Sequence, residues 1–355
     1  MPTLEDYGWT EHFAAAFEPF AAGGFEPGRV FLQHNRIYTL YTAAGETEAE
    51  TTGRLRYLAR GAEDLPAVGD WVVIRRTARE GKAKIHDLLP RRSKFSRKAA
   101  GRETEEQVVA ANVDTVFLVT GLDRDFNPRR VERYLIMAWE SGAEPVVVLN
   151  KADLVEDADA RREEIGRVAP GVPVLLLSAK RGEGVEQLLP YTGRGRTVAL
   201  MGSSGVGKST IVNRLLGSEV QRTQEVRIGD ERGRHTTTHR ELFLLEGGGL
   251  VLDTPGMREL QLLLSERGLR ETFEEIEEIA AECRFGDCRH EGEPGCAVRE
   301  ALEGGALDPA RYENYRKMRA EMRHAATLVD QRKAQEEKAR VKRIHRAFNK
   351  TNKRR

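Results

Sequence analysis

The stretch that decides the fold lies in the middle of the 355-residue chain and reads GSSGVGKST, residues 202–210. It fits the pattern G-x-x-x-x-G-K-S, follows the apolar run Thr197–Met201 and opens a helical pattern, Lys208–Leu216. This order of strand, loop and helix predicts a phosphate-binding loop, with Lys208 at the β- and γ-phosphates and the Ser209 hydroxyl on Mg²⁺. We expect the whole loop to bind the nucleotide: Gly202, Ser203, Ser204, Gly205, Val206, Gly207, Lys208, Ser209 and Thr210.

Outward from this loop, apolar runs alternate with helical patterns. Helices are expected at Arg129–Glu140 and Lys208–Leu216. Near-continuous apolar strands separated by helices predict a mostly parallel sheet covered on both faces, with ligands beyond the carboxyl ends of its strands. The expected strands are Thr115–Thr120, Pro145–Asn150, Val172–Ala179, Thr197–Gly202 and Leu250–Asp253.

A second motif, NKAD at residues 150–153, predicts which base is bound. The Asp153 carboxylate can accept hydrogen bonds from the ring N–H and the amino group of guanine, a pair of donors that adenine lacks. The Lys151 stem can cover the face of the base, and Asn150 can tie neighbouring loops together. We expect all four residues of the motif to bind GTP: Asn150, Lys151, Ala152 and Asp153.

The segment after the next strand carries a third motif, Ser178-Ala179-Lys180. The backbone N–H groups of Ser178 and Ala179, together with that of Lys180, suit the oxygen of guanine. A lone NKAD is a weak signal. Three motifs that each follow a strand predict a guanine nucleotide site.

Two further segments have the character of nucleotide switches. DTPG, residues 253–256, ends a strand, so Asp253 would hold a magnesium water and the Gly256 N–H would sense the γ-phosphate. Upstream lies RHTTT, residues 234–238, from which Thr237 is our choice to complete the magnesium shell.

The order of these motifs is rotated relative to common GTPases, which present the phosphate-binding loop first. The site needs only the strand ends together in space, so the rotation leaves the chemistry intact, and a movement of residues 233–258 could act on the C-terminal region. Met257 stands where many GTPases place a water-orienting glutamine, so we expect slow intrinsic hydrolysis. His235 is the nearest candidate to position water, the alternative being a loop histidine with no catalytic part.

All three cysteines lie in a cluster with a histidine. Cys283, Cys288, His290 and Cys296 have the spacing C-x4-C-x-H-x5-C, which predicts a tetrahedral structural site for one Zn²⁺ per chain. An odd number of cysteines without an export signal argues against disulfides. The alternative is three unrelated buried cysteines.

The N-terminal third predicts a small β-barrel of the OB type, although an SH3-like barrel would show a similar pattern. A helix over Glu11–Phe20 precedes it, and residues 91–102 hold six basic and no acidic residues, which indicates a basic linker. The barrel strands are expected at Arg29–Gln33, Ile37–Thr42, Glu48–Leu55, Trp71–Arg75 and Lys84–Leu89.

Composition and charge narrow the class of protein. The chain is 39% hydrophobic and 32% charged, has no apolar run of membrane-spanning length and begins without a signal-like pattern, so we expect a cytoplasmic protein with no membrane partner. Its net charge of +1 hides a tail, residues 331–355, with eleven Lys and Arg against two Glu. Such a block attracts polyanions, unless it is only a solvated helix end.

These features predict a multidomain α/β protein in five parts. They are a helical lead (1–27), an OB-fold domain with a basic linker (28–102), a circularly permuted GTPase domain (103–265), an α-helical zinc-knuckle domain (266–330) and a basic tail (331–355).

The permuted motifs, the barrel pattern and the cysteine–histidine knuckle together resemble the small-ribosomal-subunit-dependent GTPase A family of RsgA/YjeQ-like ribosome biogenesis GTPases. The resemblance covers nearly the whole chain. It implies binding to the small ribosomal subunit and its rRNA, late-stage subunit maturation with release or checkpointing of assembly, and hydrolysis of GTP to GDP and phosphate, stimulated by the subunit. It also carries over residues 150–153 and 202–210 as GTP-binding positions and the four cysteine and histidine residues above as zinc ligands. From the residues themselves, Lys208 and His235 are our catalytic candidates, and we expect a monomer.

Two other readings of the sequence stay open. In one, the barrel and the knuckle bind a protein and the GTPase signals through it. In the other, the chain is an RNA-binding scaffold whose nucleotide site has lost turnover. The presence of Lys208, Ser209 and Asp253 argues against the second.

Overall fold

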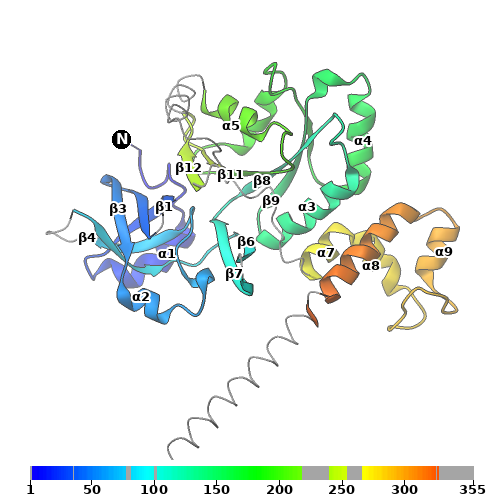
Figure 1. Cartoon of the computed structure of the whole chain (residues 1–355), viewed down its shortest axis with the longest axis horizontal. Coiled ribbons are helices and arrows are strands. Elements are labelled where there is room, and N and C mark those ends of the chain that lie inside the picture. Colours follow the sequence, from blue (N-terminus) through cyan, green and yellow to red (C-terminus); the bar gives the residue numbers. More distant parts are fainter. Residues whose placement is uncertain are drawn as a thin grey trace, which may run out of the picture. The chain divides into compact units, whose positions relative to one another are not determined.

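The computed structural model has two compact units, Met1–Leu263 and Leu264–Arg355 (Figure 1). The predicted residues His235, Thr237 and Gly256 lie outside the part of the chain that it describes, as does the basic tail. Asp253 is described as the end of a strand, without its side chain. The described residues are 2–34, 36–76, 81–99, 102–217, 240–253, 266–324 and 326–327.

The first strands of the chain close into a five-stranded barrel, β1-β2-β3-β5-β4 with β4 pairing back to β1. All pairs are antiparallel except β3 with β5. Burial alternates along β2, which places Tyr38 and Leu40 in the interior, where Val30, Ile74 and Ile85 are also fully buried. The strands are β1 (Glu26–His34), β2 (Ile37–Thr42), β3 (Gly45–Thr51), β4 (Trp71–Arg76) and β5 (Ala83–Leu88).

The strand expected over Glu48–Leu55 is wrong in its second half. The chain leaves the sheet after Thr51 and forms a short helix, α2 (Gly53–Leu58), followed by a 3₁₀ turn, η1 (Ala62–Asp64). The Thr52 hydroxyl accepts a hydrogen bond from the Leu55 N–H at 3.2 Å. This N-cap satisfies a backbone donor that the helix leaves open, which explains where the strand stops.

The helix expected near the N-terminus is present as α1 (Glu11–Ala21). It buries Phe13 against Trp71 of the barrel, and the Trp9 ring stands edge-on to Trp71 with centroids 4.7 Å apart. These aromatic rings, with Tyr7 and Leu89, form a core of their own. The N-terminal segment is therefore an integral part of the barrel.

The expected basic linker is in part a strand. β6 (Lys94–Ala99) pairs with β7 (Arg102–Ala111) in a two-stranded antiparallel sheet. Phe95 is fully buried, and Lys94 forms an ion pair with Glu106 at 2.7 Å. The acidic partner lies on the opposite strand, so the basic run by itself did not indicate that this segment pairs as a strand.

The central sheet has the order β10-β9-β8-β11-β13-β12, and only β12 is antiparallel to its neighbour. Alternate residues of β8 face opposite sides: Leu118 belongs to the same buried cluster as Leu135 of α3, and Phe117 to the same buried cluster as Ile211 of α5. Figure 1 shows the two helices on either side of the sheet. The strands are β8 (Thr115–Gly121), β9 (Glu144–Asn150), β10 (Val174–Leu176), β11 (Thr197–Met201), β12 (Arg240–Leu244) and β13 (Leu250–Asp253), and the helices are α3 (Pro128–Ser141), α4 (Ala158–Val168) and α5 (Lys208–Leu216), with 3₁₀ turns η2 (Ala152–Leu154) and η3 (Val185–Tyr191).

The sheet does not stop at the edge of this domain. β12 pairs with β1 of the barrel, with Leu32 opposite Glu241 and Gln33 opposite Arg240, so one sheet of eleven strands runs through both parts. Strand β12 was not among the expected strands, and its pairing with β1, about two hundred residues earlier in the chain, could not be predicted from local sequence.

The second unit is helical, with α7 (Glu266–Thr272), α8 (Glu274–Ala281), α9 (Ala297–Glu303) and a further helix over 309–324. Phe273 and Tyr315 pack edge to face with centroids 5.5 Å apart, and Arg311 forms an ion pair with Glu275. Among the described helices, none combines the length and apolar character that crossing a membrane requires.

Candidate functional site

The three predicted nucleotide motifs meet in one cavity of about 320 Å³. Since β9, β10 and β11 run in parallel with β8, the loops that follow them emerge at the same edge of the sheet. The cavity is lined by Asn150, Lys151, Asp153, Leu154, Ser178, Lys180, Gly205, Gly207 and Thr210.

Asn150 ties the three loops together. Its side chain is buried, and its Nδ2 donates to the Val206 carbonyl in the phosphate-binding loop at 2.8 Å. Its Oδ1 accepts from the Ala179 N–H at 2.9 Å. One amide therefore fixes the loops after β9, β10 and β11 relative to one another.

Two glycines allow the phosphate-binding loop to lie against neighbouring strand ends. Gly202 has φ 153°, and a Cβ there would stand 2.1 Å from the Val119 carbonyl oxygen. Gly207 has φ 100°, and a Cβ there would stand 2.2 Å from Asn150 Nδ2. Any side chain at these positions would force the loop away from β8 and β9.

At the base end of the cavity, the Asp153 side chain is only 9% exposed. A hydrogen bond from the Ser178 hydroxyl lowers the pKa of Asp153, so its carboxylate is ionised at neutral pH. Arg181 lies at 3.6 Å from the same carboxylate. A buried, charged acceptor of this kind suits a ligand that presents two N–H donors.

At the phosphate end, Lys208 is held by the loop itself. Its Nζ donates to the carbonyls of Gly202 and Ser203 at 2.6 and 2.5 Å. The side chains of Ser209 and Thr210, in the first turn of α5, are exposed. The loop thus presents its ammonium group and hydroxyls at the start of a helix, where an anion is stabilised.

Several contributors to this site were not found from the sequence. Arg214 of α5 donates to the carbonyls of Ala179 and Lys180 at 2.9 and 2.8 Å. Lys151, which has φ 66°, forms an ion pair with Asp123 in the loop after β8 at 2.6 Å. Lys151 was predicted from its motif, but no local motif marks Arg214 or Asp123, because their partners lie 28 to 35 positions away.

In the second unit, the predicted metal ligands are gathered in space. The ligand atoms of Cys283, Cys288, His290 and Cys296 all lie within 4.8 Å of one another. His290 Nδ1 is 3.5 and 3.4 Å from the sulfurs of Cys283 and Cys296. Three thiols and an imidazole match the donor set of a structural zinc site, so these residues fit a tetrahedral ion with Nδ1 as the histidine ligand.

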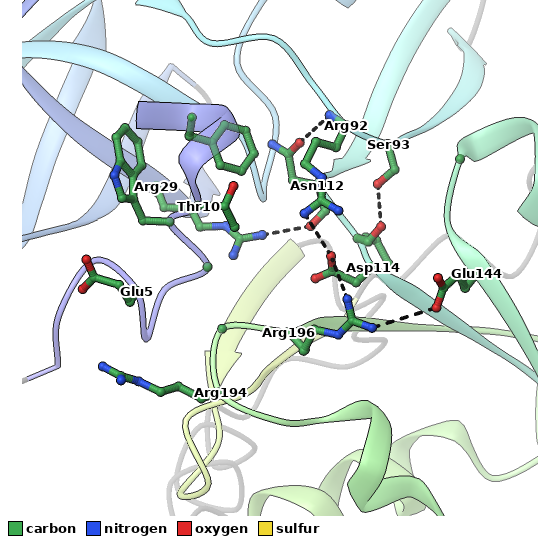
Figure 2. Close-up of a pocket in the computed structure, with 16 residues that line it drawn as sticks. Glu5, Thr10, Arg29, Arg92, Ser93, Asn112, Asp114, Glu144, Arg194 and Arg196 are labelled. Atoms are coloured by element: carbon green, nitrogen blue, oxygen red, sulfur yellow. Dashed lines mark hydrogen bonds and ion pairs between the residues drawn. The ribbon is translucent and has the colours of Figure 1, made fainter. Parts of the chain in front are cut away.

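A different polar cluster lies at the junction of the N-terminal segment, the barrel and the central sheet, around a cavity of about 350 Å³ (Figure 2). Arg29 is fully buried there and donates to three carbonyls: Tyr7, Gly69 at 3.3 Å and Asn112 at 3.0 Å. Burial lowers the pKa of Arg29 to about 10, which leaves the guanidinium charged at neutral pH.

The neighbours of Arg29 extend this junction into the central sheet. Asn112, at φ 54°, donates to Gly69 O at 3.0 Å and accepts from the Arg92 N–H at 2.9 Å. Asp114 accepts from the Thr197 N–H at 2.8 Å, where β11 begins. We call the set Arg29, Asn112 and Asp114 the junction cluster.

A phosphate-binding loop, a guanine-type pocket and their rotated order on a mostly parallel sheet define a circularly permuted GTPase fold. The model of the RsgA GTPase family matches residues 88–263. The small ribosomal subunit biogenesis GTPase RsgA of Opitutus terrae is 52% identical to this chain, and the match covers 97% of this chain and 96% of that protein. The protein of the same name from Syntrophotalea carbinolica is 47% identical, and the match covers 94% of this chain and 93% of that protein. The chain belongs to the RsgA family of GTPases.

Solved structures agree with this assignment. YjeQ from Thermotoga maritima superposes with a TM-score of 0.62 at 30% identity, covering 84% of this chain and 98% of its own. YloQ, described as a circularly permuted GTPase, superposes with a TM-score of 0.61 at 25% identity, covering 84% of this chain and 96% of its own.

Proposed function

We propose that this protein hydrolyses GTP to GDP and phosphate on the small ribosomal subunit, binds its rRNA and acts in its late maturation. Hydrolysis is stimulated by the subunit and coupled to release or checkpointing of assembly. The observation that carries the proposal is the single cavity lined by all three guanine nucleotide motifs. The names of the two relatives supply the ribosomal context.

In this proposal the cavity holds the nucleotide with the base near Asp153 and the phosphates on residues 202–210. Asp153 accepts from the base, and Lys151 covers its face. Because the Ala179 N–H is already donated to Asn150, the contact to the guanine oxygen falls to the neighbouring N–H of Lys180. Lys208 then also donates to the β- and γ-phosphates, and the bond from its Nζ to the Ser203 carbonyl directs the ammonium group toward them.

The remaining roles fall on the switch segments. Mg²⁺ is held by Ser209 and Thr237, and through a water by Asp253, while the Gly256 N–H meets the γ-phosphate. His235 positions the attacking water once the subunit is bound, because the thioether of Met257 cannot do so. The four ligands of the cysteine–histidine cluster hold one structural Zn²⁺ in the C-terminal domain.

Strand β12 gives the proposed stimulation a physical route. It begins at Arg240, shortly after the expected switch segment 234–238. It pairs both with β13 and with β1 of the barrel. We propose that the barrel is of the OB type and that it, the zinc domain and the basic tail bind rRNA in the cytoplasm, the chain acting as a monomer. RNA bound to the barrel would then bias the switch segments through this strand.

The test is single-turnover GTP hydrolysis by the purified chain, with and without small ribosomal subunits. We expect the subunits to raise the rate on the order of 10²–10⁴-fold, with large subunits as the control. His235→Ala should keep subunit binding and lose the stimulation, whereas deletion of residues 331–355 should weaken binding and leave the unstimulated rate unchanged. Equal rates with both subunits would overturn the ribosomal role.

A further inference from the structure

A closed ring of hydrogen bonds lies beside the phosphate-binding loop. Arg130 Nη1 donates to Ser203 Oγ at 2.6 Å, and Ser203 Oγ donates to Asp125 Oδ2 at 3.0 Å. The other carboxylate oxygen of Asp125 accepts from Arg130 Nη1. Ser203 is the second residue of the loop and lies 73 positions from Arg130 in the sequence.

The position of Arg130 is unfavourable for the helix that carries it. It lies in the first turn of α3, which has no acidic residue, so the positive end of the helix macrodipole repels its charge. Asn127 caps the helix by accepting from the Arg130 N–H at 3.2 Å, which fixes the backbone there. The helix alone gives no reason for an arginine at this site, whereas the contact with the phosphate-binding loop does.

The ring is connected to the phosphate-binding lysine. Ser203 offers its hydroxyl to Arg130 and Asp125, and its carbonyl accepts from Lys208 Nζ at 2.5 Å. The loop after β8, which carries Asp125, also reaches the base side of the cavity. The Asp125 N–H donates to the Asp123 carboxylate, and Asp123 forms an ion pair with Lys151. Arg130 therefore bonds the side chain of the residue whose carbonyl is one of two that hold the Lys208 ammonium group.

We propose that Arg130 is a positioning residue for phosphate binding: by holding Ser203, it places Lys208 for the β- and γ-phosphates of GTP. The proposal rests on the proposed function, since it assumes that the cavity binds GTP. Arg130 and Asp125 are about one third and one quarter exposed, so the ring lies at the surface of the site and does not belong to the core.

The experiment measures the affinities of the full-length protein for a non-hydrolysable GTP analogue, GDP and the matching ATP analogue, with Mg²⁺ present. Arg130→Ala should weaken binding of the GTP analogue about tenfold, which corresponds to about 1.4 kcal/mol. Binding of GDP should weaken by about threefold or less, because GDP lacks the γ-phosphate. The preference for guanine over adenine should be unchanged, because Asp153 is not part of the ring. Arg130→Lys keeps a charged donor and should recover most of the affinity.

Ser203→Ala removes the hydroxyl on which Arg130 acts. It should reproduce the loss, and the double variant with Arg130→Ala should be no weaker than either single variant. The matched control is Arg124→Ala, which removes an exposed arginine from the same loop and should leave all three affinities unchanged.

The outcomes separate the two proposals. If the wild-type protein does not prefer guanine nucleotides, the proposed function fails and the role of Arg130 fails with it. If the wild type binds the GTP analogue and Arg130→Ala binds it equally well, only the role of Arg130 is overturned. Equal losses for all three nucleotides, or additive losses in the double variant, would also overturn it, because they indicate a general loss of structure.

Discussion

The nucleotide cavity and the junction cluster are both polar and both lie where segments distant in the sequence meet, but they use their polar groups differently. At the junction, the Arg29 guanidinium donates to three carbonyls of the protein. In the nucleotide cavity, the Lys208 ammonium bonds two carbonyls of its own loop, and the Ser209 and Thr210 side chains face solvent.

The difference shows how to separate a structural polar cluster from a binding site. A buried charge is tolerated only when its surroundings compensate for the lost water, and Arg29 has three carbonyl acceptors and the nearby charges of Asp70 and Asp114 within the fold. A binding site must instead keep groups that exchange partners when a ligand arrives. We therefore expect changes at the junction to affect stability and changes in the cavity to affect affinity.

The cysteine–histidine cluster gives the largest expected effect, because in our proposal its four side chains find their partner in an ion. Cys288→Ala should remove the zinc, and apparent binding free energies of structural zinc are about 10–16 kcal/mol in small domains. We expect one zinc per chain in the wild type and none in the variant by elemental analysis. The C-terminal unit should lose its unfolding transition while guanine affinity is retained. Wild-type protein purified without chelators and free of zinc would contradict this.

In the cavity, Asp153→Asn should weaken GTP binding on the order of 10³-fold, because two hydrogen bonds to a buried charge are lost at about 2 kcal/mol each. The new amide can donate to the 2-oxo group of xanthine, so xanthine nucleotides should bind better than to the wild type. A displacement assay with GTP, XTP and ATP measures this. Thermal stability should be unchanged, and equal competition by ATP in the wild type would refute the guanine assignment.

At the junction, Arg29→Met should lower the free energy of unfolding by about 3 kcal/mol, since three carbonyls lose a charged donor. Chemical denaturation measures the loss. GTP affinity below the melting temperature should stay within about twofold, because Arg29 does not line the nucleotide cavity.

Arg196→Ala is the matched control at the same junction. Its guanidinium is half-exposed and 3.8 Å from Asp114, so a loss of less than about 1 kcal/mol is expected. If Arg196→Ala destabilised the protein as much as Arg29→Met, burial would not be the reason for the effect of Arg29.

The smallest effect concerns pH. The pKa of Asp153 is lowered from its ordinary 3.8 by the Ser178 hydroxyl, so the carboxylate stays charged as pH falls and loses its charge only below that value. GTP affinity should therefore change by less than about threefold between pH 7 and pH 5, in a fluorescence titration. A steep fall in this range would mean that Asp153 is protonated there and that the Ser178 contact is absent.

Much of the cavity could be predicted from the sequence, because its parts are local. A phosphate-binding loop needs glycines, a lysine and a hydroxyl within nine consecutive residues, and the base motif needs four. The strands before these motifs are apolar runs, and four of the five expected in the central sheet begin within one residue of the observed β8, β9, β11 and β13. The fifth was expected from Val172 and spans only Val174–Leu176.

The two misplaced elements have different causes, one distant in the sequence and one local. Lys94–Ala99 has the composition of a linker and becomes a strand because β7 supplies Glu106 and a pairing edge. Glu48–Leu55 has a strand-like composition throughout and changes to helix at a single capping residue, Thr52. Composition alone decides neither case, because the first depends on a strand partner and the second on one capping hydrogen bond.

The sequence by itself determined the candidate chemistry of this protein, namely which residues are expected to hold phosphate, guanine and zinc, because each of these ligands requires particular side chains within a short run. Tertiary structure decided which polar groups are consumed by the fold. Arg29 bonds to carbonyls 22, 40 and 83 positions away, Arg130 reaches Ser203, and β12 pairs with β1. The physical reason is that a hydrogen bond depends on proximity in space, and only the packing of the sheet and the barrel brings such distant groups within about 3 Å of each other.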